Sequence, residues 1–214
     1  MSRYRSVSTK PGIPDLVTAN LIRFRGHFMR IISGQFKSRH LKAAPPVGTR
    51  PTSDKLRETL FNILGASVAR CTFLDGCAGV GAIGIEAISR GAENVVFVDQ
   101  SRKATRMIRE NLKDLEVEDG FRILEMDLAK ALDLSSREGI AFDTAFIDPP
   151  YDREDIYEAA LLRFGNGSLL GTDGLLILEH SKRTNLPETA GRLRKVRNLI
   201  QGDSALAFYR TEGA

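Results

Sequence analysis

The sequence has only two cysteines and lacks any long apolar run. Cys71 and Cys77 have no Cys or His cluster of metal-ligand spacing nearby, so two buried thiols are favoured over a redox or metal site. No stretch approaches the roughly eighteen apolar residues that span a bilayer, and the amino terminus lacks the apolar core of a secretory signal. We therefore expect a cytoplasmic protein with no metal and no membrane partner.

Acidic residues are scarce at the amino-terminal end. Through Arg57 there are twelve Lys or Arg against two acidic residues, a net charge of +10, whereas the remaining residues carry −6. This separation is expected of a phosphate-contacting arm beside an acidic body, although a solvated, disordered tail fits equally well. The 214 residues, with 42% hydrophobic and 27% charged side chains, otherwise resemble one ordinary globular domain with a small appendage.

Three regions follow from the pattern along the chain. Residues 1–28 show no sustained periodicity and are predicted to be a flexible leader; Met29 is a plausible translation start, and an organelle transit peptide is an alternative. Residues 29–65 are predicted to form a basic hairpin and a helix that face RNA. Residues 66–214 are predicted to form the catalytic domain.

Within residues 29–65, the pattern over residues 30–42 predicts a short, basic β-hairpin or an extended strand pair, and a Pro-rich linker follows. A helix comes next, with Thr52 or Ser53 as its cap and Gly65 at its end. Its apolar face is formed by Leu56, Leu60, Phe61 and Leu64.

Beyond this helix, short apolar runs alternate with amphipathic ones, which is typical of βαβ units and a parallel sheet. The predicted strands are Thr72–Asp75, Asn94–Asp99, Phe121–Glu125, Thr144–Asp148 and Leu175–Glu179. The predicted helices are Gly81–Arg90, Lys103–Leu115, Leu128–Leu134 and Arg153–Phe164. Residues 193–199 and 205–209 are predicted to form a closing antiparallel hairpin around a turn at residues 201–203. The fold class is therefore α/β, of the Rossmann-like kind.

The first of these strands ends in a glycine-rich loop, where Gly79-x-Gly81-x-x-Gly84 immediately precedes a helix. Glycines permit positive φ and a close ligand approach, and the helix start offers free N–H groups. The motif matches the dinucleotide-binding fingerprint. The alternative is a tight strand-to-helix turn that binds no ligand. However, Asp75 at the mouth of the loop would repel a pyrophosphate and attract a cation, so S-adenosylmethionine is favoured over NAD.

Two further acids follow the next strands. Asp99 can accept hydrogen bonds from both ribose hydroxyls of a cofactor, a role common to NAD and S-adenosylmethionine sites. Asp127 could accept from an adenine amino group or cap the helix that begins at Leu128, and both remain open.

The fourth strand ends in Asp148-Pro149-Pro150-Tyr151. The prolines fix φ and remove N–H donors, which leaves carbonyl acceptors on a rigid turn. Asp148 and the Pro149 carbonyl are predicted to orient an exocyclic amino group, and the Tyr151 ring to stack on the base plane. An ordinary surface turn is the alternative. A base must be unpaired or flipped to enter such a pocket, which single-stranded RNA allows cheaply.

Together these motifs resemble those of class I amino methyltransferases. When Met29 to Gly34, Arg50-Pro51-Thr52 and the Arg57 to Leu64 run are added, the chain resembles the RsmD family over roughly residues 29–210. That resemblance implies a seven-stranded sheet with an antiparallel last strand. It also implies methyl transfer from S-adenosylmethionine to N2 of one guanine in 16S rRNA of an assembling 30S subunit. We expect the protein to be a monomer. Gly76-Cys77-Ala78 and Asp99 depart from the residues common in the family without removing a functional group.

The candidate residues fall into three groups. The catalytic residues are Asp148, Pro149, Pro150 and Tyr151. The cofactor-binding residues are Asp75, Gly76, Ala78, Gly79, Gly81, Asp99, Gln100 and Asp127, with Arg50 and Thr52 closing the pocket by the resemblance. The RNA-binding residues are Arg30, Lys37, Arg39, Lys42, Lys55 and Arg57.

Other functions and residues stay open. A DNA adenine-N6 or protein-glutamine methyltransferase, a nicotinamide-dependent dehydrogenase and a non-catalytic RNA-binding module are the competing hypotheses. His180 is expected to be a structural histidine rather than a site residue. A basic run near the carboxyl terminus could contact RNA or form a solvated strand face; it comprises Arg192, Arg194, Lys195 and Arg197.

Overall fold

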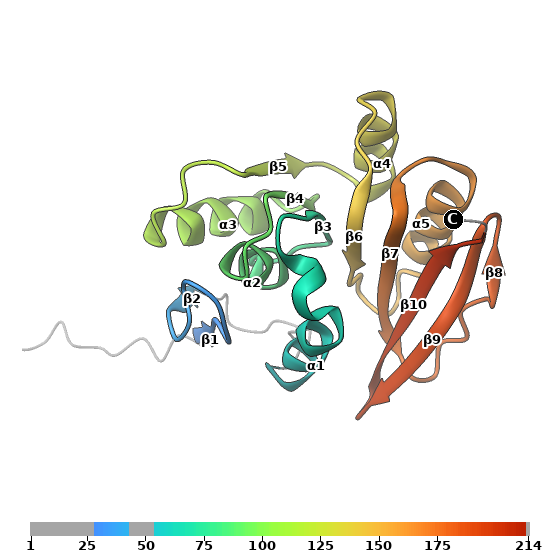
Figure 1. Cartoon of the computed structure of the whole chain (residues 1–214), viewed down its shortest axis with the longest axis horizontal. Helices are drawn as coiled ribbons and strands as arrows, with labels where there is room; N and C mark the ends of the chain where they lie inside the picture. Colours follow the sequence, from blue (N-terminus) through green and yellow to red (C-terminus); the bar gives the residue numbers. More distant parts are fainter. Residues whose placement is uncertain (1–27, 43–53, 213–214) are drawn as a thin grey trace, which may run out of the picture.

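A computed structural model of the chain describes residues 28–42 and 54–212. Its centre is an eight-stranded sheet of order β5-β4-β3-β6-β7-β10-β9-β8 (Figure 1). The strands are β3 (Thr72–Gly76), β4 (Asn94–Asp99), β5 (Phe121–Glu125), β6 (Phe142–Ile147), β7 (Leu170–Ser181), β8 (Thr189–Ala190), β9 (Leu193–Gln201) and β10 (Ser204–Thr211). Strands β3 to β7 pair in parallel, whereas β10 is antiparallel to both β7 and β9. The predicted Rossmann-like sheet with an antiparallel last strand is confirmed.

The structure also adds to the predicted sheet. The two-residue strand β8 pairs with the beginning of β9 and raises the strand number above the expected seven. Strand β7 is longer than predicted because it includes the segment from Leu170 to Gly174. The Gly and Asp residues in this segment are typical of loops, so it was not predicted as part of a strand.

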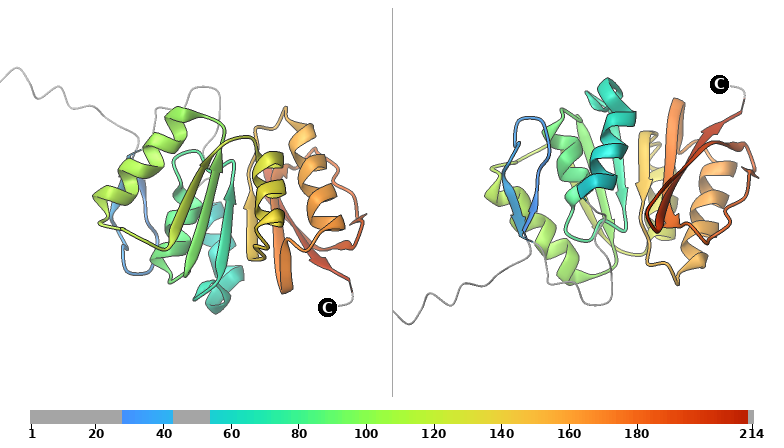
Figure 2. Two further views of the ribbon diagram at one scale, coloured as in Figure 1. Left: turned by 90° about the horizontal axis from the view of Figure 1, so that it is seen from above. Right: turned by 90° about the horizontal axis from the view of Figure 1, so that it is seen from below.

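Helices cover both faces of the sheet, as the two views of Figure 2 show. They are α1 (Asp54–Leu64), α2 (Ala82–Ser89), α3 (Arg102–Asp114), α4 (Leu128–Arg137) and α5 (Glu154–Asn166), with a 3₁₀ turn at Gly65–Val68. Side chains alternate between the faces of a strand, so Phe73 and Phe97 pack in the core under α1, α2 and α3, whereas Leu74 and Val96 pack in the core under α4 and α5. None of the helices in the described residues is long and apolar enough to cross a membrane.

The predicted amino-terminal hairpin is present as β1 (Phe28–Arg30) and β2 (His40–Lys42), with Met29 opposite Leu41. It is not a free appendage, because Ile31 and Leu41 are buried in the same core as Phe61 of α1 and Phe73 of β3. The boundary expected between residues 65 and 66 therefore does not separate two hydrophobic cores.

A buried carboxylate fastens this hairpin to α2. The Glu86 side chain, which is fully buried, accepts hydrogen bonds from the amides of Ile32 at 2.7 Å and Ser33 at 3.0 Å, and from Nε of Arg90 at 2.8 Å. Gly34 follows with φ +85°, and a Cβ there would lie 1.8 Å from the Ser89 carbonyl oxygen. Only glycine therefore permits the hairpin to approach the end of α2 this closely.

Candidate active site

The two motif-bearing loops lie side by side at the carboxyl edge of the sheet. The glycine loop joins β3 to α2, and the Asp148–Tyr151 loop leaves β6, the parallel neighbour of β3. The amide of Asp148 donates to the carbonyl of Gly76 at 3.1 Å, which joins the loops directly. Residues more than seventy positions apart thus meet at the sheet edge where ligands bind in α/β folds.

The glycine loop has the backbone that its sequence predicts. Gly79 and Gly81 have φ of +56° and +80°, and a Cβ on Gly79 would meet nothing within 4 Å, so this position faces open space. Gly84 is glycine for a packing reason, because a Cβ there would lie 2.2 Å from the Phe97 ring. Cys77 also has positive φ, 63°, a conformation that costs a non-glycine residue on the order of 1 kcal/mol. The predicted pair of buried thiols holds for Cys71, whereas Cys77 is partly exposed.

Asp75 lies beneath this loop and is almost completely buried. Its Oδ2 accepts a hydrogen bond from the amide of Gly84 at 2.8 Å, so the strand supplies an acceptor for the first turn of α2, whose cap residue Gly81 has none. Burial, against the lowering effect of the Gly84 amide and together with the nearby Asp148 and Asp99, raises the pKa of Asp75 to about 8. A cationic ligand would favour the charged forms of these three neighbouring carboxyl groups, whereas a pyrophosphate would oppose them.

Asp99 connects the end of β4 to the glycine loop. Its Oδ2 accepts from the amide of Gly79 and its Oδ1 from the amide of Ser101, both at 2.8 Å. Burial raises the pKa of Asp99, whereas the two amides lower it. Each carboxylate oxygen can accept more than one hydrogen bond, so these contacts fix the side chain and leave it capable of accepting from a ligand hydroxyl. The neighbouring Gln100 is exposed.

The structure shows one of the two roles expected of Asp127. It is the N-cap of α4, and its Oδ1 accepts from the amides of Ala129 at 2.9 Å and Lys130 at 3.4 Å. Helix capping is therefore established by the geometry, and contact with an adenine group stays a prediction.

The Asp148–Tyr151 loop is a turn in which Pro149 is buried and Pro150 is exposed. The Pro150 carbonyl accepts from the amide of Arg153 at 2.9 Å, which closes the turn. Tyr151 is 43% exposed, and its hydroxyl lies 2.8 Å from Oγ of Ser204 at the start of β10. An exposed aromatic ring tethered at its far end is available to stack on a planar group.

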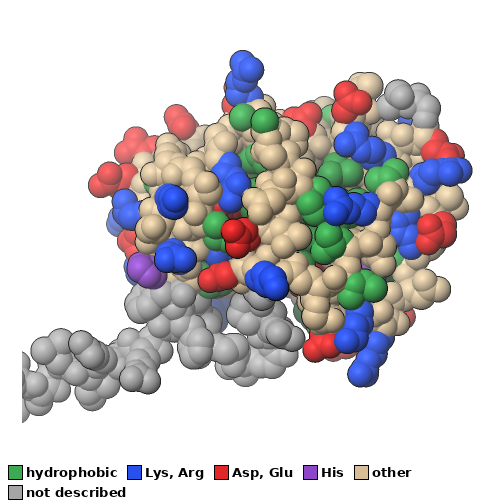
Figure 3. Space-filling model, turned by 60° about the horizontal axis from the view of Figure 1, so that its bottom comes forward, with side chains coloured by type: hydrophobic (Ala, Val, Ile, Leu, Met, Phe, Trp, Pro, Cys, Tyr) green, Lys and Arg blue, Asp and Glu red, His purple; other side chains and the backbone are tan. Residues whose placement is uncertain are grey.

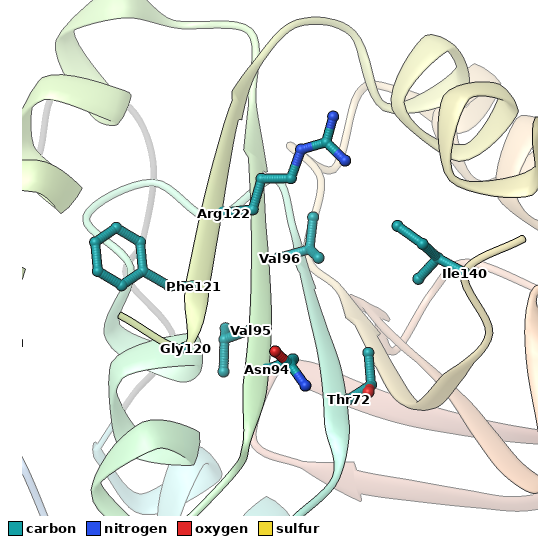
Figure 4. A pocket seen from close by; sticks show the side chains of 8 residues that line it. All are labelled: Thr72, Asn94, Val95, Val96, Gly120, Phe121, Arg122 and Ile140. Carbon is teal, nitrogen blue, oxygen red and sulfur yellow. The ribbon is translucent and has the colours of Figure 1, made fainter. Parts of the chain in front are cut away.

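A separate depression of about 400 Å³ lies at the opposite, amino end of the strands (Figure 4). Its lining includes Thr72 and Asn94, the first residues of β3 and β4, and Gly120, which precedes β5. None of the candidate residues lines it, and we place the site at the carboxyl edge because the motifs, the acids and the open glycine position converge there.

Comparison with known proteins agrees with this geometry. Residues 29–210 match the family described as Conserved hypothetical protein 95. YlbH of Bacillus subtilis (strain 168), an rRNA methyltransferase by its provisional name, is 38% identical over 185 residues, which cover 86% of this chain and 100% of that protein. Ribosomal RNA small subunit methyltransferase D of Escherichia coli (strain K12) is 31% identical over 184 residues, 86% of this chain and 90% of that one. The chain belongs to the RsmD family of methyltransferases.

The fold agrees as well. The solved structure of yhhF from Escherichia coli, provisionally described as a methyltransferase, matches with a TM-score of 0.74 at 28% identity, over 87% of this chain and 99% of that chain. The family and the fold together exclude the dehydrogenase hypothesis.

For an RsmD-family chain, the predicted RNA-binding residues have mixed surroundings. Arg30, Lys37 and Lys55 are exposed. Arg39 donates to the Asp114 carbonyl at 2.6 Å, and Lys42 forms an ion pair of 2.7 Å with the carboxylate of the same residue, so both also bind the end of α3. Arg50 and Thr52 lie outside the described residues.

The prediction that Arg57 contacts RNA is wrong. Its side chain is fully buried and donates to the Arg30 carbonyl at 2.6 Å and to Asp54 at 2.9 Å. Burial lowers the pKa of Arg57, and the Asp54 and Glu86 carboxylates oppose that effect. This arginine joins α1 to β1 instead of facing solvent.

His180 has the surroundings of a structural histidine. It is buried, and its ring nitrogens lie 2.8 Å from the Ser181 carbonyl and 3.2 Å from Oδ1 of Asn198. Both contacts lie within the sheet, which agrees with the expected structural role.

The sequence did not indicate Asn111, which couples two parts of this RsmD-family site. Its side-chain amide accepts from the amide of Lys42 at 2.8 Å and donates to the carbonyls of Lys42 and Val80, both at 3.1 Å. One buried side chain of α3 therefore holds the hairpin strand β2 against the glycine loop. A polar residue next to Leu112 on the buried face of a helix is the signal that could have identified it.

Proposed function

We propose that this protein methylates the exocyclic N2 of a guanine in 16S rRNA of the assembling small ribosomal subunit, with S-adenosylmethionine as the methyl donor. The observation that carries the proposal is the hydrogen bond between Asp148 and Gly76, which brings the amino-orienting loop against the glycine loop. The names of the relatives support an rRNA substrate, and the acids around the glycine loop support a cationic donor.

The residues fit this donor by their charges and by the space that they leave. Asp75 and Asp99 would hold its cationic amino acid part and its ribose hydroxyls, and the open side of Gly79 would lie against it. When bound, S-adenosylmethionine supplies an electrophilic methyl group on a sulfonium centre.

The Asp148–Tyr151 loop would act on the acceptor. The Asp148 carboxylate and the Pro149 carbonyl accept hydrogen bonds from the base amine, which orients the nitrogen lone pair towards the methyl group. The Tyr151 ring stacks on the base plane, and its tether to Ser204 limits where the base can lie. No strong general base is needed before attack, because the amine proton becomes acidic only as the nitrogen gains positive charge.

The hairpin would bind RNA outside the pocket. Neutralising Lys37, Arg39 and Lys42 should weaken RNA binding and reduce the salt slope of its affinity by up to about three units, near one for each phosphate that is no longer neutralised. An unchanged slope would reject the hairpin as an RNA contact.

The decisive experiment measures transfer of a labelled methyl group to 30S particles that lack the modification, beside naked DNA and release-factor protein. We expect transfer to the 30S rRNA alone, with the label on guanine N2 after nuclease digestion and chromatography. Replacement of Asp148 by Ala should abolish transfer and preserve most of the RNA affinity. Labelling of DNA adenine or of protein glutamine would refute the assignment, and full activity of the Asp148 variant would refute the mechanism.

A further inference from the structure

A second concentration of positive charge lies near the carboxyl terminus. Residues 58–181 contain twelve basic and twenty-two acidic side chains, a net charge of −10, whereas residues 182–214 contain seven basic and three acidic ones, a net charge of +4. The acidic body is thus flanked by basic segments on both sides along the chain. A polyanion would be repelled by the body and attracted to either flank.

The second basic segment forms the side of the sheet opposite to the amino-terminal hairpin. It includes Lys182 and Arg183, which follow β7, and the strand β9. Beyond Lys195 the outer edge of β9 has no strand partner among the described residues, because β8 pairs only with Leu193 and Arg194. On the half of the molecule that holds β9 and β10, Figure 3 shows Lys and Arg side chains interleaved with apolar ones.

The side chains of this segment combine available charge with apolar contact surface. In the described part of the chain, Arg183, Arg192 and Arg197 form no ion pair, whereas Arg194 and Lys195 pair with Glu212 and Glu188. The Arg197 guanidinium also lies over the Phe208 ring, 5.8 Å from its centre, a distance at which a cation is attracted to the face of an aromatic ring.

Two large apolar side chains of β9 are also exposed: Val196 is 51% and Ile200 is 61% exposed. Arg197 lies opposite Phe208 and Ile200 opposite Ala205, so Arg197 and Ile200 project from opposite faces of the strand. A nucleic acid backbone that runs along this edge can therefore place its phosphates against the arginines and its sugars against the apolar groups.

This surface is continuous with the candidate active site. The β9–β10 turn is joined to the segment after β7 by the ion pair of Lys182 with Asp203, at 2.9 Å. The next residue, Ser204, is hydrogen-bonded to Tyr151 of the Asp148–Tyr151 loop at 2.8 Å. RNA whose target base enters the pocket therefore has its adjoining backbone close to this turn.

We infer that β9, the β9–β10 turn and the segment after β7 bind the sugar-phosphate backbone of the substrate RNA beside the target base. The inference rests on the proposed function and adds a second RNA contact, on the far side of the pocket from the hairpin. Cations on an unpaired strand edge can also serve to prevent edge-to-edge association of sheets, so the experiment must separate the two roles.

The experiment compares two double variants that each remove two exposed arginines without an ion pair in the described residues. The test variant is R183Q/R197Q. The control is R70Q/R137Q, whose arginines precede β3 and end α4, at the amino edge of the sheet. Affinity for rRNA of unmodified 30S particles is measured from 50 to 300 mM salt, with methyl transfer at saturating RNA as a second measurement.

For R183Q/R197Q we expect the slope of log affinity against log salt to fall by about 1.4, near 0.7 for each single-stranded phosphate that is no longer neutralised. Transfer at saturating RNA should stay within about twofold of the unaltered protein, because the Asp148–Tyr151 loop is intact. The control variant should keep the original slope.

Equal slopes for the two double variants would overturn the inference, and so would self-association of R183Q/R197Q with unchanged RNA affinity, since that result assigns the cations to edge protection. Failure of the proposed function is distinguishable, because it would appear as absence of transfer to RNA by the unaltered protein before any variant is compared.

Discussion

Replacing Glu86 tests whether one buried carboxylate holds the amino-terminal hairpin on α2. Its two oxygens accept from Ile32 at 2.7 Å, Ser33 at 3.0 Å and Arg90 at 2.8 Å. Glu86→Ala would leave two partly buried amides and a partly buried guanidinium without their acceptor. Removing one partner of a buried ion pair costs about 3–5 kcal/mol, and an orphaned buried donor about 1–3 kcal/mol.

We therefore expect Glu86→Ala to lower the free energy of unfolding by about 3–5 kcal/mol, and the isosteric Glu86→Gln by about 1–3 kcal/mol. The chain has no tryptophan, so urea unfolding is followed by far-ultraviolet circular dichroism. Amide hydrogen exchange over residues 31–38 reports the hairpin itself and should accelerate in both variants.

The matched control is Glu110→Gln, which removes an ion pair to Arg106 on an exposed helix face. Such a pair contributes about 0.3–0.5 kcal/mol. The reasoning fails if Glu86→Ala costs less than about 1 kcal/mol, or if exchange over residues 31–38 does not change.

Three further predictions follow from the candidate site. Because the pKa of Asp75 is raised to about 8, its carboxyl group is protonated in the ligand-free protein at neutral pH. Its contribution to the free energy of unfolding is therefore fully present at low pH and is lost as the pH rises through about 8. Binding of S-adenosylmethionine should become tighter over the same pH range and should release a proton from Asp75. Calorimetry in buffers of different ionisation enthalpy measures this proton, and binding without proton release would contradict the prediction. Gly84→Ala should destabilise the fold by about 1–3 kcal/mol through its contact with the Phe97 ring, and an unchanged melting temperature would contradict the packing. Tyr151→Phe and Ser204→Ala each remove the same 2.8 Å hydrogen bond, so each should slow methyl transfer roughly threefold to tenfold and the double variant no more; additive losses would show that the tether does not act as a pair.

The parts of the fold that depend on local pattern could be predicted from the sequence. Alternating apolar runs located the strands β3 to β7, and glycines with an acid at a strand end located the loop around Gly79. The closing hairpin was also predicted from the local pattern, but its antiparallel position in the sheet was predicted from the family resemblance. Local patterns carry no information on strand order, so the approach of Ser204 to Tyr151 was not foreseen from the residues.

The error on Arg57 has a physical origin that the sequence did contain. Counting charges treated every basic residue as exposed, yet Arg57 lies three, four and seven positions before Leu60, Phe61 and Leu64, the apolar stripe of α1. Helical periodicity therefore placed it on the buried face. The two roles of Asp127 could not be separated in this way, because a cap and a ligand contact both require an acid directly after a strand.

The topology of β10 bears on how the chain folds during synthesis. This strand occupies an interior position between β7 and β9 although it follows both of them in the sequence. As the chain leaves the ribosome, β7 therefore waits with an unpaired edge until almost the whole sequence has been translated, and β9 cannot join the sheet before β10 is inserted. Removal of residues 204–214 should therefore give a protein that aggregates through the unpaired edge of β7 rather than a smaller active enzyme.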